Sequence, residues 1–130
     1  MILLDTHAWV WWVHGDKRLS QTQAAAIAEA EADEIGVSII SCWEVAKLVE
    51  CGRLSLDAEV RQWLSQALSY PGVSLLPLTP DIVVESTQLP GEFHRDPADQ
   101  MIVATARIYH VPLVTSDEKL IRYPHVQTLQ

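Results

Sequence analysis

The stretch that decides the fold is MILLDT, residues 1–6, an apolar run that ends at the acid Asp5. Three later stretches have the same form, because each is an apolar run bounded by turn formers or charges: EIGVSI at 34–39, VSLLPL at 73–78 and VPLVTSD at 111–117. Runs of this kind predict short strands that are buried on both faces of a sheet.

Segments with helical periodicity lie between these runs, at 20–33, 41–51, 57–69, 80–89 and 97–109. Strands that alternate with helices predict an α/β fold whose central sheet is mostly parallel and flanked by helices on both sides. A chain of 130 residues suits one core, so we expect a single domain over 1–130. A core-like strand stands where a signal peptide would, and no apolar run could span a bilayer, which predicts a cytoplasmic protein with no membrane contact.

The formal net charge of −8 argues against a protein whose whole surface attracts nucleic acid, since such binding needs many Lys and Arg side chains. Any contact with nucleic acid is therefore expected to be local. The same charge attracts basic polypeptides and divalent cations. Cys42 and Cys51 have no second pair that would complete a zinc site, and we expect them to be buried free thiols.

Four acids fall at the end of a predicted strand or near the start of a predicted helix. Asp5 and Asp117 end strands, Glu44 lies near the start of one helix, and Asp99 lies in the first turn of the helix that follows the loop at 89–97. Ligands of open α/β sheets bind at the carboxyl ends of the parallel strands. These four positions are therefore the candidates for a functional site.

Residue spacing indicates where the helical acids point, because residues three and four apart share one face of a helix. Each acid is in line with apolar residues: Asp99 with Ile102, Val103 and Ala106, Glu44 with Leu48 and Cys51, and Asp117 with Leu120 and Ile121. An acid that only favours a helix N-terminus more often lies on the polar face. We therefore expect these acids to point inward and to converge with Asp5 at one edge of the core.

Such a cluster needs a positive charge, since two like charges about 4 Å apart repel by roughly 4 kcal/mol at an effective dielectric near 20. Arg95 could pair with one acid, whereas Lys47 and Lys119 are expected on other faces of their helices. Mg²⁺ or Mn²⁺ would neutralise the cluster better, because these hard cations take oxygen ligands and act on phosphodiesters. Zinc is disfavoured, since no His pair or Cys cluster has ligand spacing.

Helix capping is the competing interpretation of the same acids. The SCWE stretch is also a capping-box sequence, in which Glu44 reaches back to the backbone of Ser41. Asp96 could cap a helix that has a proline in its first turn, with Asp99 favoured by the helix dipole. Asp5 is harder to explain in this way, since a charge that ends an apolar strand must be solvated in a cleft or paired. The conjunction of four acids favours metal binding.

Four stretches, in this order and spacing, resemble the PIN-domain ribonucleases and, among them, the VapC-type toxins of bacterial toxin–antitoxin pairs. They are LLDTHAWVWW at 3–12, SCWEVAKLVECGRL at 41–54, HRDPADQMIVATA at 94–106 and VPLVTSDEKLIRY at 111–123. The resemblance covers nearly the whole chain. It implies a PIN-like α/β fold, a homodimer, and a small antitoxin whose basic or aromatic segment lies across the active site.

The same resemblance implies a metal-dependent endoribonuclease, whose acidic residues map here onto Asp5, Glu44, Asp99 and Asp117. We expect hydrolysis of an RNA phosphodiester by a water that Mg²⁺, or Mn²⁺ as a substitute, activates. Asp5 and Asp99 are the principal expected ligands and Asp117 a further one, while Glu44 completes the shell or orients the water. Whether Asp96 contacts the metal itself or positions Asp99 stays open.

Other polar residues near these acids are expected to assist. Thr6, Thr115 and Ser116 are placed to hydrogen-bond a carboxylate or a phosphate, although hydroxyls beside strand ends also serve as caps. Arg95 could hold the scissile phosphate, or it could form a salt bridge with a neighbouring acid, Asp96 or Glu92.

The aromatic stretch AWVWWVHG, 8–15, is apolar over more of a helix than one core contact requires. Trp9 and Trp12 share a helical face and are expected in the core, whereas an exposed Trp11 would suit a dimer or antitoxin groove. His7 and His14 are expected to be packing or loop residues, and His94 gives no functional signal.

A binding module is the alternative hypothesis. The chain would then be a catalytically inactive PIN-like domain whose acidic pocket binds a basic partner peptide. The two hypotheses differ in one observable, since only the enzyme cleaves RNA in a metal-dependent reaction.

Overall fold

The computed structural model describes residues 1–32 and 34–130, and in them five strands form one parallel sheet in the order β3-β2-β1-β4-β5. The strands are β1 (Ile2–Leu4), β2 (Ile35–Ser38), β3 (Val73–Leu76), β4 (Leu113–Val114) and β5 (Thr128–Leu129). The first strand of the chain therefore lies at the centre of the sheet. The predicted α/β class with a parallel sheet is confirmed.

Helices connect these strands, and the described residues contain α1 (Thr6–His14), α2 (Gln21–Ala30), α3 (Ile39–Glu50), α4 (Val60–Leu68), α5 (Pro80–Ser86), α6 (Pro97–Tyr109) and α7 (Glu118–Ile121). The segment expected at 20–33 is helical over Gln21–Ala30 as α2, residues 31 and 32 form a turn, and residue 33 lies outside the described residues. The segment expected at 41–51 begins earlier, because the Ser38 side chain accepts a hydrogen bond from the Ile40 backbone and acts as the N-cap of α3. None of these helices has the length and apolar character needed to cross a membrane.

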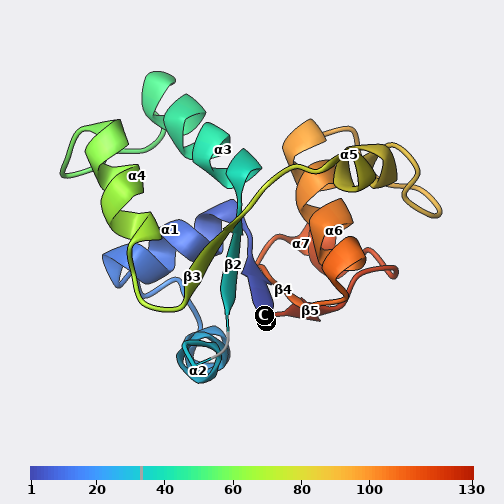
Figure 1. The fold of residues 1–130 in the computed structure, drawn as a ribbon, viewed down its shortest axis with the longest axis horizontal. Helices are drawn as coiled ribbons and strands as arrows, with labels where there is room; N and C mark the ends of the chain where they lie inside the picture. Colours follow the sequence, from blue (N-terminus) through green and yellow to red (C-terminus); the bar gives the residue numbers. More distant parts are fainter. Residues whose placement is uncertain (33) are drawn as a thin grey trace.

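Helices cover both faces of the sheet, as predicted: Figure 1 shows α1, α3 and α4 on one side and α5, α6 and α7 on the other. The central strand β1 contributes side chains to the core on both faces of the sheet, since successive side chains of a strand point in opposite directions. Ile2 and Leu4 are buried with Trp9 of α1, whereas Leu3 is buried with Ile102 of α6. The expectation that MILLDT is buried on both faces is confirmed.

The two edge strands differ from the expectation. Leu75 of β3 is 42% exposed, so this strand is not buried on both faces. It lies at the edge of the sheet and pairs only with β2, which leaves its outer side less covered. At the opposite edge, β5 has no counterpart in the sequence prediction, because its two residues form too short a run to recognise. Its pairing with β4 comes from tertiary contact.

The predicted burial of the tryptophan and cysteine side chains is confirmed only in part. Trp9 is fully buried and Trp12 packs half-buried against the same core, as expected. Both cysteines are free, as expected, but Cys51 is exposed and Cys42 is only half-buried. The expectation of buried thiols is therefore wrong for Cys51, which caps the C-terminus of α3 where the chain leaves the core.

Gln23 ties α2 to the ends of β4 and β5. Its side chain is fully buried, and its Nε2 lies 3.2 Å from the carbonyl oxygen of Thr115 and 3.3 Å from that of Leu129. The same amide completes a capping box with Ser20 at the start of α2. Because buried polar groups need partners, this one side chain links α2 to the backbone just after β4 and to the end of β5.

We expect Gln23→Ala to lower the free energy of unfolding by about 2–4 kcal/mol, because two buried carbonyls lose a donor and a cavity replaces the amide. Gln21→Ala, at an exposed position of the same helix, is the matched control and should cost less than about 0.5 kcal/mol. Urea denaturation measures both variants. Equal midpoints would contradict the linking role of Gln23.

Candidate active site

The acids expected at the site come from four segments that meet at one edge of the sheet. Asp5 follows β1, Glu44 lies in the helix that follows β2, Asp117 comes shortly after β4, and Asp99 lies in the first turn of α6. The strands β2, β1 and β4 are neighbours in a parallel sheet, so their carboxyl ends lie side by side. The sheet order thus places Asp5 between the segments that carry Glu44 and Asp117.

Asp5 is the most enclosed of these acids, with 6% of its surface exposed. Its Oδ1 accepts a hydrogen bond from the Ala8 backbone at 2.8 Å, which makes Asp5 the N-cap of α1. Its Oδ2 accepts from the Thr115 hydroxyl, as expected for Thr115. In the part of the chain that the structure describes, no Lys or Arg forms an ion pair with Asp5. Burial raises the pKa of Asp5, and hydrogen bonds from Thr115 and Ala8 oppose that shift only in part.

Glu44 is held by a pair of hydroxyls. Its Oε1 lies 2.6 Å from the Thr6 hydroxyl, and Ser41 Oγ lies 3.0 Å from the same Thr6 oxygen. Since Thr6 has one hydroxyl hydrogen, it donates to Glu44 and accepts from Ser41. The capping box considered for Ser41 and Glu44 is wrong, because α3 begins at Ile39 and Ser41 lies inside the helix. Burial raises the pKa of Glu44 as well.

Asp99 contacts a histidine that the sequence analysis missed. His94 Nε2 lies 2.7 Å from Asp99 Oδ2, and the His94 ring packs against Phe93 with the ring centres 4.4 Å apart. Asp96 accepts from the Asp99 backbone at 3.0 Å and is the N-cap of α6, so its capping role is confirmed. The Asp99 side chain is 19% exposed, and burial raises its pKa. Only the closeness of His94 to Asp99 in HRDPAD could have suggested this contact.

Three residues expected at the site do not have the positions or contacts that the sequence predicted for them. Asp117 is exposed and accepts from the Lys119 backbone as the N-cap of α7, so it does not lie on the inward face of that helix. The helix begins only after Asp117, which places this acid outside the helical periodicity. Ser116 contacts the Gln23 amide and not a carboxylate. Arg95 is exposed and forms neither of the salt bridges considered for it within the described residues.

The negative charges of some of these acids add to the raised pKa values of others. Burial is the largest cause of the raised pKa of Asp5 and of Glu44, and the negative charge of Asp99 adds to it in both. For Asp99, the charges of Asp96 and Asp117 add to burial in the same way. Charges shift a pKa in this manner only when they are close. Asp5, Glu44 and Asp99 therefore form one cluster, with Asp96 and Asp117 at its rim.

The donors of this cluster fit a hard divalent cation, since they are carboxylate oxygens backed by hydroxyl groups. Burial without a cationic partner destabilises the ionised form of Asp5, and a bound cation would relieve that destabilisation. Among the described residues, no three His, Cys, Asp or Glu side chains already stand together as a ligand group. Mg²⁺ tolerates such a site, because it keeps several waters and is often bound by only one or two carboxylates. Asp5 and Asp99 would hold the ion.

The chain belongs to the PIN domain family, whose model matches residues 2–126. Among curated proteins it is similar to Ribonuclease VapC22 of Mycobacterium tuberculosis, with 38% identity over 124 residues that cover 95% of this chain and 92% of that protein. The predicted family is confirmed by both comparisons.

Solved structures share the fold at lower identity. A toxin–antitoxin complex from Klebsiella pneumoniae matches with a TM-score of 0.67 and 20% identity, over 100% of this chain and 97% of that chain. VapBC2 from Rickettsia felis, bound to a DNA fragment from its promoter, matches with a TM-score of 0.70 and 18% identity, over 99% of this chain and 98% of that chain. These structures confirm the PIN-like arrangement of the sheet and helices.

We expect Asp5→Asn to raise the thermal stability of the metal-free protein near neutral pH. The pKa of Asp5 is raised in the folded state, so the folded protein holds the Asp5 proton more tightly than the unfolded chain does. The free energy of unfolding therefore falls as pH rises above the ordinary pKa of 3.8. Asn keeps the helix cap and the contact with Thr115 without the charge. Melting temperatures in a chelator, from about pH 4 to about pH 8, should show a gain that grows with pH.

Addition of Mn²⁺ should then affect the melting temperatures of the wild type and of Asp5→Asn differently. At roughly one hundred times its dissociation constant it should raise the melting temperature of the wild type by about 10 °C, because it binds the folded state only. The same addition should leave Asp5→Asn nearly unchanged. An equal rise in both proteins would contradict the assignment of Asp5 as a ligand.

His94 is expected to position Asp99, since groups that orient a ligating carboxylate typically change metal affinity by about 10- to 100-fold when removed. His94→Ala should weaken Mn²⁺ binding by that factor, as measured by electron paramagnetic resonance of the free ion. His125→Ala is the control, because His125 is exposed, packs against Tyr123 and forms no ion pair with an acid among the described residues. Unchanged affinity in His94→Ala would show that the contact with Asp99 has no role in metal binding.

Proposed function

We propose that this protein is a metal-dependent endoribonuclease and the toxin component of a toxin–antitoxin pair. The observation that carries the proposal is Asp5, a buried carboxylate without a Lys or Arg partner in the described residues, at the end of the central strand. Glu44 and Asp99 join it in a cluster in which the charge of Asp99 adds to the raised pKa of both Asp5 and Glu44. The similarity to a protein named as a ribonuclease supports the same reaction.

The ion, Mg²⁺ with Mn²⁺ as a substitute, supplies Lewis-acid chemistry when bound, since it activates water and offsets charge on a phosphate. Asp5 and Asp99 would hold it, and each is fixed in orientation, Asp5 by Thr115 and Asp99 by His94. Such fixed ligands need no rearrangement during the reaction. Glu44, which Thr6 holds through Oε1, orients the attacking water.

Two exposed residues at the rim complete the proposed site. Asp117 caps α7 through Oδ1, so its Oδ2 is available as a further metal ligand. Arg95 is exposed beside Asp96 and is proposed to contact the scissile phosphate. A guanidinium suits this task because it donates several hydrogen bonds in one plane.

A cognate antitoxin is the proposed protein partner. A pocket of about 370 Å³ adjoins the acid cluster and is lined by Ile40, Trp43, Glu44, Asp96, Pro97 and Ala98. Its acidic edge and exposed Trp43 suit a partner segment that carries a cation next to an apolar side chain. Toxin–antitoxin complexes among the structures of similar fold support this assignment. We further propose that residues 1–130 act as one domain, as a homodimer, in the cytoplasm where RNA is present.

Purified protein should cleave single-stranded RNA in Mg²⁺ or Mn²⁺, and a chelator should stop the reaction. Asp5→Asn and Asp99→Asn should each lower the rate by at least about 100-fold, since each removes a charge that holds the ion. Asp81→Asn is the matched control: Asp81 also lies in the first turn of a helix that begins with proline, but it is exposed on α5. Separation of labelled RNA on a gel measures the rate.

Cleavage that persists in both Asp5→Asn and Asp99→Asn would overturn the proposed mechanism. No metal-dependent cleavage of any RNA by the wild type, together with tight binding of a basic peptide that Glu44→Gln weakens, would instead support the catalytically inactive binding module. RNA cleavage and peptide binding can be measured on the same protein preparation, which therefore distinguishes the two functions. The peptide would compete with RNA only if both bound at the acid cluster.

A further inference from the structure

Two adjoining pockets lie along α1, outside the acid cluster. The arginine pocket, of about 400 Å³, includes His7, Trp11, Arg18, Leu48 and Arg53 in its lining. The aromatic pocket, of about 430 Å³, includes Val13, Asp57, Trp63, Gln66 and Tyr70. His14 and Ser55 line both, so the two pockets are neighbours. Volumes of this size accommodate small organic groups.

The arginine pocket adjoins the proposed cleavage site. Leu48 lies one helical turn after Glu44 on α3, and His7 lies one residue after Thr6 at the start of α1. A chain that passes the acid cluster can therefore continue into this pocket.

The two arginines of this pocket differ in what they offer. The Arg18 guanidinium is held by Asp16, with Nη2 at 2.8 Å from Oδ2, and lies over the Trp11 ring at 5.2 Å from its centre. Its charge is thus offset, and its plane is fixed. Arg53 is exposed and forms no ion pair in the part of the chain that the structure describes. Arg53 is therefore the cation available to a ligand.

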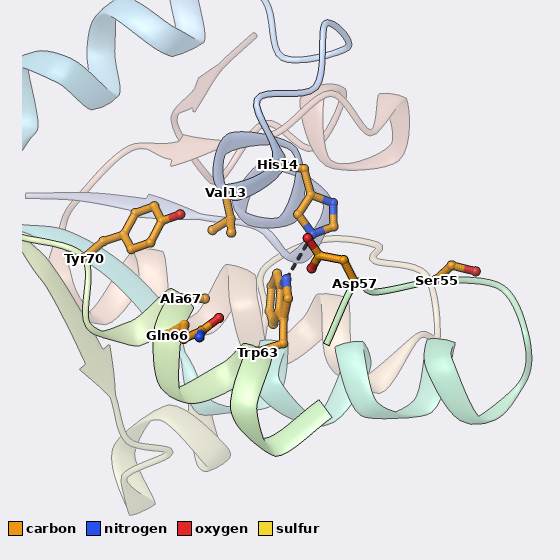
Figure 2. A pocket seen from close by; sticks show the side chains of 8 residues that line it. All are labelled: Val13, His14, Ser55, Asp57, Trp63, Gln66, Ala67 and Tyr70. Atoms are coloured by element: carbon orange, nitrogen blue, oxygen red, sulfur yellow. Dashed lines mark hydrogen bonds between the residues drawn. The ribbon is translucent and has the colours of Figure 1, made fainter. Parts of the chain in front are cut away.

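The aromatic pocket offers a different set of groups, as Figure 2 shows: an apolar wall at Val13, with polar groups from Asp57 and Gln66. Trp63 Nε1 donates to His14 Nε2 at 2.9 Å, so a neutral His14 carries its proton on Nδ1. The Asp57 carboxylate is an acceptor on an exposed residue. A planar ligand with an amino group would find apolar contact and a hydrogen-bond acceptor here.

We propose that these two pockets bind the single-stranded RNA that flanks the cleaved bond, with the phosphodiester backbone against Arg53 and a base in the aromatic pocket, its amino group donating to Asp57. This inference rests on the proposed nuclease function. Single strands bind where a cation tracks the backbone and planar groups receive bases. Arg53 supplies the cation here, and Tyr70, which is 39% exposed, is the aromatic ring available at the aromatic pocket, since Trp63 is buried. A basic protein segment fits less well, because Arg53 would repel it.

The test uses the full chain with Asp5→Asn, so that RNA is bound and not cleaved, and fluorescein-labelled adenylate and uridylate homopolymers of about 12 nucleotides. Arg53→Gln should weaken binding of both by roughly 5- to 10-fold and reduce the slope of log K against log salt by about 0.7, the value for one phosphate contact. Arg61→Gln removes the same charge at an exposed site that lines neither pocket, and should do neither.

Asp57→Ala supplies the second readout. Adenine has an amino group and uracil has none, so the variant should lose about 10-fold in its preference for adenylate over uridylate. If Asp57 acted only through its negative charge, its removal would strengthen binding of both homopolymers equally, which would overturn the base assignment. Asp81→Ala is the control for loss of an exposed acid.

The outcomes separate this inference from the proposed function. If the wild type cleaves RNA while Arg53→Gln and Arg61→Gln bind RNA with equal affinity and equal salt dependence, the pocket proposal is wrong and the nuclease function stands. The same result with a loss of antitoxin binding in Arg53→Gln would assign the pocket to the protein partner. If the wild type neither binds nor cleaves RNA, the proposed function itself fails.

Discussion

The burial of one carboxylate, that of Asp5, is the constraint on which the site depends. Three contacts in series keep it in place: the Gln23 amide binds the Thr115 carbonyl, the Thr115 hydroxyl donates to Asp5, and Asp5 accepts from the backbone at the start of α1. A charge held in this way is unfavourable in the protein alone, since burial raises its pKa. The fold tolerates it because the surrounding core is large and because the position suits a cation.

Those parts of the fold that depend on local pattern could be predicted from the sequence. The alternating burial of Ile2, Leu3 and Leu4 follows from an apolar run in a strand with helices on both faces, and α6 follows from Asp96, a proline and a 3.6-residue period. Parts that depend on tertiary contact could not. The pairing of β5 with β4 depends on such contact. The early start of α3 and the contact between His94 and Asp99 are local but were not predicted: Ser38 caps the helix before the expected start, and His94 lies only five residues before Asp99.

A carboxylate that caps a helix keeps the capacity to bind a ligand. A carboxylate has two oxygens with about four lone-pair directions, whereas an N-cap uses one of them. Asp5 caps α1 through Oδ1 and still presents Oδ2 to Thr115, and Asp117 caps α7 through Oδ1 alone. Only at Glu44 was the cap a true competitor, and there the helix begins too early for it to form. Acids at helix starts therefore gain a fixed orientation from the cap without losing their capacity to bind.

An acidic protein can bind a polyanion if its few cations are placed well, because salt screens exposed charges beyond about 8 Å at physiological ionic strength. Four of its nine Lys and Arg side chains already pair with acids: Arg18, Lys47, Arg107 and Arg122. The net charge of −8 therefore repels a polyanion only weakly and at long range. Over the distance of a single contact, Arg53, which forms no ion pair among the described residues, would outweigh it. Under the proposed function, recognition would depend on a short stretch of RNA at a fixed distance from the acid cluster, and shape near the site would select the substrate more than overall charge does.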